Sequence, residues 1–250
     1  MVTSSIAGTA SPLLAEARAA WRQRTVTEYR SSQIFARFLT EVLAAGDDHT
    51  VHERVLEMVK EELEHVQLCE TVCRHLGVDA PMPSPESLKE PAQFSSAPAQ
   101  ERALHTAITM LLINETLSVG FIEDLHARCT NPPIQRVLAA TLGDEAQHER
   151  FGFEYVQRAL RRYSESARRD FRHLVALTLQ GHLAQAEQVL SRVPANKQTL
   201  EAWPDYERVK LGLFSPERQA LVFQKTLTTK LLPILAKLDL VPDTLRGAQS

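Results

Sequence analysis

Two segments of the sequence place a glutamate and a histidine three residues apart within an apolar helical pattern. The pair is Glu62 and His65 in "KEELEHVQLC", and Glu145 and His148 in "DEAQHERFG". Residues at i and i+3 of a helix are neighbours on one face, so both side chains of a pair can reach the same point. A buried carboxylate is costly unless a cation compensates it, and carboxylate and imidazole both bind metal ions. The two pairs therefore predict metal binding.

A further glutamate precedes each pair on an apolar helical face. Glu28 lies 34 residues before Glu62, and Glu115 lies 30 residues before Glu145. Each separation lets the chain continue along one helix, turn, and come back along the next helix to the level of the first glutamate. We expect four converging carboxylates to share two divalent ions, because they would otherwise repel one another in the core. The candidate ligands, which we also predict to be the catalytic residues, are Glu28, Glu62, His65, Glu115, Glu145 and His148.

Chance alone accounts for part of this pattern. With 22 Glu and nine His in 250 residues, about one Glu-x-x-His pair is expected by composition, and three occur. The third pair, Glu123 and His126, lies too far along its helix from Glu115 to share its site, so we interpret it as structural. Glu61 is the alternative ligand if the rotation of its helix differs from the one assumed for Glu62.

Helical periodicity runs through almost the whole chain, and no strand pattern interrupts it. Four long helices are expected at about 12–45, 50–76, 100–129 and 133–163. The segment 78–100 carries five prolines and reads as a long crossover between the two helix pairs. Two further helices are expected at about 165–192 and 215–240, with an irregular segment at 193–214 and flexible termini. The prediction is an all-α chain forming one domain over residues 1–250. Residues 11–163 would form a metal-binding four-helix bundle with a long crossover, and residues 164–242 would add two C-terminal helices.

The six candidate ligands and this helix order resemble the ferritin-like di-iron carboxylate superfamily over about residues 12–163. "DEAQHERFG" is similar to the fourth-helix motif of its oxygenases, including aldehyde-deformylating oxygenases. The resemblance implies two iron ions, with a mixed manganese–iron pair also open, and O2 as co-substrate. It further implies a small, largely apolar organic substrate and an external electron donor such as a ferredoxin or a reductase.

Departures from particular branches narrow this resemblance. The radical-generating ribonucleotide reductase subunit has a tyrosine where this chain has Ile122, and the arylamine N-oxygenases have a histidine where it has Thr141. Rubrerythrins add a cysteine-rich domain that the sequence does not contain. The resemblance therefore favours an O2-dependent oxygenase or oxidase. The alternative is a ferroxidase or other iron-handling protein, and the third possibility is a helical bundle with vestigial sites.

Charge, cysteine count and hydropathy argue against a nucleic-acid-binding protein, a secreted protein and a membrane protein. The net charge of −3 gives no reason to expect nucleic acid as a partner. Three cysteines are an odd number that suits free thiols, and neither a signal peptide nor a membrane span is evident. These features predict a cytoplasmic protein. Separately, we expect a monomer or a homodimer.

Some side chains have two open interpretations. His182 lies on an apolar stripe and is either a core histidine or a contact to a ligand. The aromatic residues that could line a substrate channel, and could equally be ordinary core, are Phe35, Phe38, Phe121, Phe151 and Tyr155.

Overall fold

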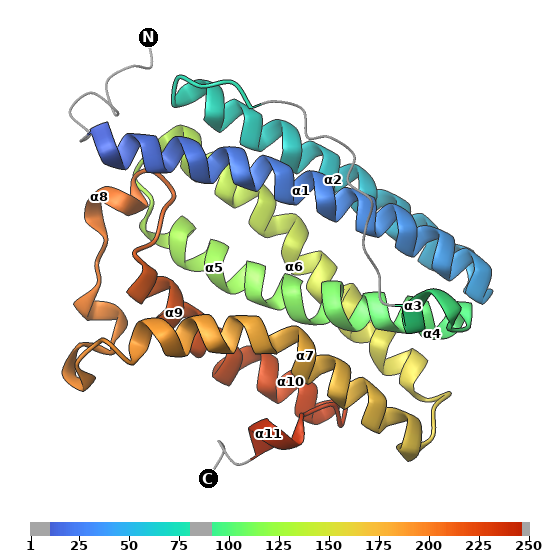
Figure 1. The fold of residues 1–250 in the computed structure, drawn as a ribbon. Helices are drawn as coiled ribbons and strands as arrows, with labels where there is room; N and C mark the ends of the chain where they lie inside the picture. Colours follow the sequence, from blue (N-terminus) through green and yellow to red (C-terminus); the bar gives the residue numbers. More distant parts are fainter. Residues whose placement is uncertain (1–10, 81–91, 247–250) are drawn as a thin grey trace. The chain divides into compact units, whose positions relative to one another are not determined.

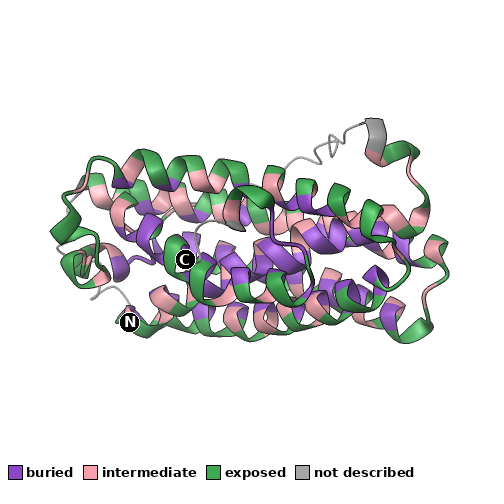
Figure 2. Cartoon of the chain, turned by 90° about the horizontal axis from the view of Figure 1, so that it is seen from below, coloured by how far each residue is buried: buried purple, intermediate pink, exposed green. Residues whose placement is uncertain are grey.

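The computed structural model of the chain describes residues 11–80 and 92–246. Within these ranges the chain is helical, with no strand, so the all-α prediction is confirmed. Each long helix carries a buried stripe and an exposed one, as expected for helices packed in bundles (Figure 2). The predicted flexible termini lie outside the described residues.

The described residues divide into two compact units. Unit 1 comprises residues 11–80 and 92–103, Leu125–Thr141 and Tyr206–Leu213. Unit 2 comprises Leu104–Asp124, Leu142–Asp205 and residues 214–246. The prediction of a single domain stays a prediction.

Unit 1 is dominated by two helices that pack side by side, α1 (Ser11–Ala45) and α2 (His49–His75) (Figure 1). Gly46 makes the turn between them with a φ of 74°, a conformation that glycine adopts without steric cost. Asp48 caps α2, because its carboxylate accepts a hydrogen bond from the Val51 amide at 3.2 Å. Unit 1 also holds α3 (Ala92–Ser96), a short helix inside the predicted crossover, and α8 (Tyr206–Val209).

Trp21 joins α1 to the chain that follows α8. Its indole N–H donates a hydrogen bond to the Leu211 carbonyl at 2.8 Å. Gly212 then passes so close to the indole that an added Cβ would lie 2.8 Å from it. These contacts anchor a short C-terminal segment on the helix that carries Glu28.

The third predicted helix is continuous over Ala99–Arg128 but not α-helical throughout. It consists of α4 (Ala99–Thr106), a π-helical segment η1 (Ala107–Asn114) and α5 (Glu115–Arg128). The fourth is α6 (Pro132–Leu160) and the fifth is α7 (Glu165–Leu190), which packs on η1. The prediction missed the π-helical segment, because the apolar residues within it are compatible with an ordinary helix.

The sixth predicted helix, at about 215–240, is continuous over residues 216–237 but, like the third, is not α-helical throughout. It is divided into α9 (Pro216–Thr226), a π-helical segment η4 (Leu227–Leu231) and α10 (Leu232–Lys237). Pro233 explains the division, because it has no N–H for an i→i−4 hydrogen bond and its ring crowds the preceding turn. The expected irregular segment contains only brief helices, η2 (Ala195–Lys197), η3 (Leu200–Ala202) and α8, and α11 (Asp243–Arg246) follows α10.

The helical run Ala99–Arg128 is the one described segment long and apolar enough to cross a membrane. However, 61% of its most apolar window is buried inside the protein, as in the core helix of a water-soluble protein. This finding is consistent with the prediction of no membrane span.

Arg218 is a buried cation that holds several segments of unit 2 together. Its guanidinium donates to both carboxylate oxygens of Asp124, at 2.9 and 2.6 Å. It also donates to the carbonyls of Leu200 and Trp203, at 2.7 and 2.8 Å. One side chain therefore connects α9 to α5 and to the loop around η3.

Replacing Arg218 with alanine is expected to lower the free energy of unfolding by about 3–5 kcal/mol, because Asp124 would keep a largely buried charge without its partner. Lys230→Ala is the matched control, since it removes the ion pair with Glu123 between two substantially exposed side chains. That control should cost at most about 1 kcal/mol. Denaturant unfolding measures both, and equal losses in the two variants would contradict the role given to Arg218.

Candidate metal centre

Glu28, Glu62 and His65 come together in unit 1. One ligand atom of each lies within 4.8 Å of the others. The Nδ1 atom of His65 is 3.8 Å from Glu28 Oε2 and 3.8 Å from Glu62 Oε2. His65 and Glu62 are almost fully buried, and the side chain of Glu28 retains 17% exposure. We call this group the first triad.

The α1–α2 hairpin explains the first triad. Glu28 and His65 are almost equally far along the chain from the turn at Gly46, so they reach the same height on the two packed helices. Glu62 lies one turn before His65 on the same face of α2. The local pattern and the hairpin together therefore determine the group.

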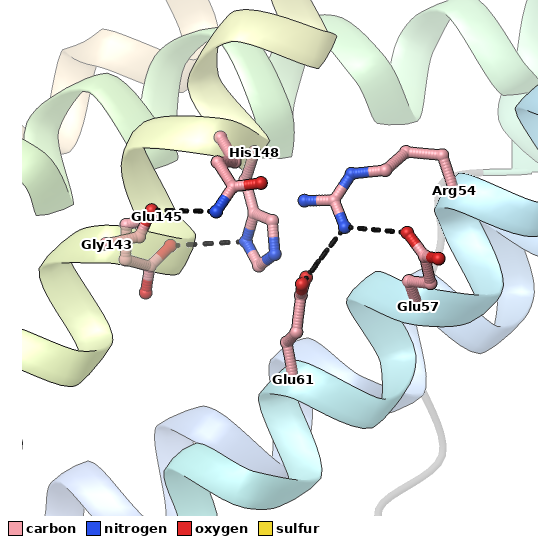
Figure 3. A network of polar contacts seen from close by, with 7 residues as sticks. Arg54, Glu57, Glu61, Gly143, Glu145 and His148 are labelled. Carbon is pink, nitrogen blue, oxygen red and sulfur yellow. Dashed lines mark hydrogen bonds and ion pairs between the residues drawn. The ribbon is translucent and has the colours of Figure 1, made fainter.

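Glu61, the alternative to Glu62, faces a different partner. Arg54 donates to both of its carboxylate oxygens, at 3.0 and 3.1 Å, and also contacts Glu57 at 3.3 Å (Figure 3). Glu61 therefore belongs to an ion-pair network along α2, and the structure places Glu62 in the triad.

Glu115, Glu145 and His148 come together in unit 2, with ligand atoms within 4.8 Å of one another. All three are buried. The Nδ1 atom of His148 is 3.4 Å from Glu145 Oε2 on the same face of α6 (Figure 3). We call this group the second triad.

The π-helical segment sets the position of Glu115 in the second triad. Glu115 is the first residue of α5, and its backbone N–H donates to the Met110 carbonyl, an i→i−5 bond. One extra residue in a turn rotates the following side chains by roughly 100° relative to a continuous α-helix. Gly152 allows η1 to approach α6, because a Cβ at this position would lie 2.8 Å from the Leu111 carbonyl carbon.

The ligand distances suit metal coordination. Separations of 3.4–3.8 Å between imidazole nitrogen and carboxylate oxygen are longer than good hydrogen bonds. They are the separations expected of two ligands bound at about 2.0–2.2 Å to one ion. Each triad offers two carboxylates and one imidazole, so ionised carboxylates and neutral imidazole would balance one divalent cation. Each buried group can therefore bind a metal ion.

Arg24 is a residue near the first triad that sequence reasoning missed. Its guanidinium donates to the Gly212 carbonyl at 2.9 Å and lies 4.5 Å from the centre of the Trp21 ring. Burial lowers the pKa of Arg24, and the Glu28 carboxylate opposes that shift. The i−4 spacing to Glu28 was the available signal, because it places both residues on one side of α1.

Unit 1 contains buried thiols, and Cys69 lies near Glu28 of the first triad. Burial raises the pKa of Cys69 well above its ordinary value, and the Glu28 carboxylate raises it further. Burial raises the pKa of Cys73 and Cys129 as well. The three cysteines are therefore buried, protonated thiols at neutral pH, in accordance with the prediction that they are free.

The remaining candidates lie outside the triads. Glu123 forms an ion pair with Lys230 at 2.8 Å, which supports its structural interpretation. Phe35, Phe38 and Tyr155 are buried, as core residues would be. His182 and Phe121 line a cavity in unit 2 instead.

Comparison with known protein families, curated proteins and solved structures finds no match to this chain.

Proposed function

We propose that each triad holds one iron ion, and that the protein is a non-haem di-iron oxygenase or oxidase that uses O2. Its substrate would be a small, largely apolar organic molecule. The observation that carries the proposal is the repetition of one ligand set. Each unit assembles a glutamate from one helix with a Glu-x-x-His pair from another. This is the ligand arrangement of ferritin-like di-iron proteins.

The six candidate ligands would form two groups of three, one for each ion. Glu28, Glu62 and His65 would hold one, and Glu115, Glu145 and His148 would hold the other. Mixed oxygen and imidazole ligands suit iron and manganese. When bound, two iron ions would supply the electrons and open coordination positions that O2 activation requires.

The protein itself would contribute negative charge, the positions of the ligands and the exclusion of water. Four carboxylates would neutralise the two ions, and burial of Glu62, Glu115 and Glu145 would exclude water from the reacting species. The Nδ1 atoms of His65 and His148 must carry no proton in order to bind, so metal uptake would release any proton held there. Because the charges balance within each triad, a neutral apolar substrate is favoured over a charged one. Electrons for repeated turnover would come from an external ferredoxin or reductase.

Metal content per chain tests the proposal most directly. Protein expressed with added iron should carry about two iron ions per chain, and Glu145→Ala should lose at least one of them. Glu149→Ala, one turn further along α6 and outside the triads, is the matched control and should retain both ions. A wild-type protein without iron or manganese would exclude the oxygenase.

Oxygen consumption separates the oxygenase from the iron-handling alternative. With catalytic amounts of protein and a chemical reductant, an oxygenase should incorporate label from 18O2 into an apolar substrate. A ferroxidase would consume O2 only in proportion to added Fe(II). A large hollow assembly in solution would also favour iron storage over the proposal.

A further inference from the structure

A cavity of about 250 Å³ lies in unit 2, between the packed helices α7 and α9. None of the groups in the two triads belongs to its wall. The lining residues that matter for binding are Phe121, His182, Gln185, Gln219, Ala220 and Phe223. This wall combines aromatic rings with two side-chain amides, and its described residues carry no formal charge other than any on His182.

His182 and Phe223 form an aromatic pair in the wall of this cavity. Their rings stack with centroids 5.8 Å apart and an interplanar angle of 23°. Burial lowers the pKa of His182, so its imidazole is neutral at physiological pH. Phe121 contributes another aromatic surface and is itself held edge-on by Phe214, at 6.0 Å. The cavity therefore suits an uncharged, planar apolar body.

A second cavity, of about 360 Å³, adjoins the first, because Val189 and Pro216 line both. Its character is different, since Arg192 and Lys197 lie in its wall together with one acid, Glu217. Neither cation forms an ion pair with any residue in the described part of the chain. The Trp203 indole N–H donates to the Lys197 carbonyl at 2.8 Å and so fixes the loop that carries one of the cations.

Together the cavities have a neutral aromatic end and an end with an excess of positive charge. We propose that they bind one small aromatic carboxylate, with its ring against Phe121, His182 and Phe223 and its carboxylate at Arg192 and Lys197. A planar ring matches the stacked wall, and a carboxylate matches cations with free donors. This site is separate from the metal triads and does not depend on the proposed oxygenase activity.

Calorimetric titration of the full-length protein with 2-naphthoate tests the proposal. The naphthalene ring suits a wall of aromatic side chains, and 2-naphthamide has the same ring with an uncharged head group. We expect saturable binding of one 2-naphthoate per chain. The amide should bind at least about fivefold more weakly, the difference expected for one partly exposed charge pair.

Two kinds of variant assign the binding to the cavities. The double variant Arg192→Gln/Lys197→Gln should weaken 2-naphthoate binding about fivefold or more and leave 2-naphthamide unchanged. Lys225→Gln removes an exposed cation of α9 outside both walls and should change neither. Ala220→Phe should fill the aromatic end and abolish binding of both compounds. Gln219→Trp fills it from an exposed position, so the test stands even if Ala220→Phe fails to fold.

The proposal is overturned if 2-naphthoate does not bind saturably, or if the amide binds equally well. It is also overturned if a folded filling variant binds 2-naphthoate as tightly as the wild type. Thermal unfolding of each variant confirms that it is folded. Metal content does not enter any of these readouts, so failure of this site is distinguishable from failure of the di-iron proposal.

Discussion

Addition of Fe(II) under anaerobic conditions, or of Mn(II), is expected to raise the thermal midpoint of the metal-free protein by about 5–10 °C for each ion bound, at concentrations about 100-fold above Kd. The reason is linkage: the ions would bind the triads, which exist in the folded protein and not in the unfolded chain. Calorimetric or fluorescence melting curves, recorded with and without the ion, measure the shift.

Glu62→Gln is expected to stabilise the metal-free protein and to reduce its stabilisation by metal. Glu62 is 1% exposed, and glutamine keeps its shape without its charge. We expect the metal-free variant to be more stable than the metal-free wild type by about 1–3 kcal/mol. It should also lose about half of the metal-dependent rise in melting temperature, because the first triad loses an anionic ligand while the second keeps its own.

Glu64→Gln is the matched control, since Glu64 is exposed on the same helix and lies outside both triads. It should leave both the metal-free stability and the metal-dependent shift unchanged. A Glu62→Gln protein that is less stable without metal and still gains the full shift would show that Glu62 is a structural residue and not a ligand.

Two glycines of α6 should respond to alanine with opposite signs. At Gly152 an added Cβ would lie 2.6 Å from the Leu111 Cβ and 2.8 Å from the Leu111 carbonyl carbon. Because moving the Leu111 backbone would strain the helix, Gly152→Ala should lower the free energy of unfolding by about 1–3 kcal/mol. At Gly143 nothing lies within 4 Å of the added Cβ. Gly143→Ala should therefore stabilise the helix by about 0.5–1 kcal/mol.

Denaturant unfolding of the two variants measures these changes, and metal content gives a second readout. Gly152 lies one turn after His148, and Leu111 lies one turn before Glu115. Separating α6 from η1 should therefore weaken metal binding by the second triad in Gly152→Ala but not in Gly143→Ala. If both substitutions stabilise the protein and leave metal content unchanged, the close approach is not needed for the site.

The contribution of the sequence differs between elements of the candidate site. Glu62–His65 and Glu145–His148 were predictable because the i, i+3 geometry of a helix is local and the residues around each pair are apolar. The local pattern does not decide between Glu62 and Glu61, because neighbouring residues differ by roughly 100° in direction. In the structure Glu61 pairs with Arg54, and Glu62 lies beside Glu28 and His65.

In the sixth predicted helix, by contrast, the local pattern did not predict the hydrogen bonding of the backbone. Its apolar periodicity extends across Pro233, and the pattern alone does not reveal how a helix accommodates the missing N–H. In the structure, the missing N–H is accommodated by the π-helical segment η4 immediately before α10. Likewise, the apolar run 107–113 does not reveal that η1 is π-helical, because the hydrogen-bond register depends on what packs against the helix.

By itself the sequence determined the all-helical class, the positions of the long helices and the two Glu-x-x-His pairs, because each depends on residues within a few turns of one another. The tertiary structure decided what those residues meet. It brought Glu28 opposite His65 through the packing of α1 on α2, and it set the rotation of Glu115 through η1. It also formed the adjoining cavities from α5, α7, α9 and the loop at 193–203. Such contacts depend on hairpin geometry, close helix approach and loop course, which involve residues far apart in the chain and therefore leave no local pattern.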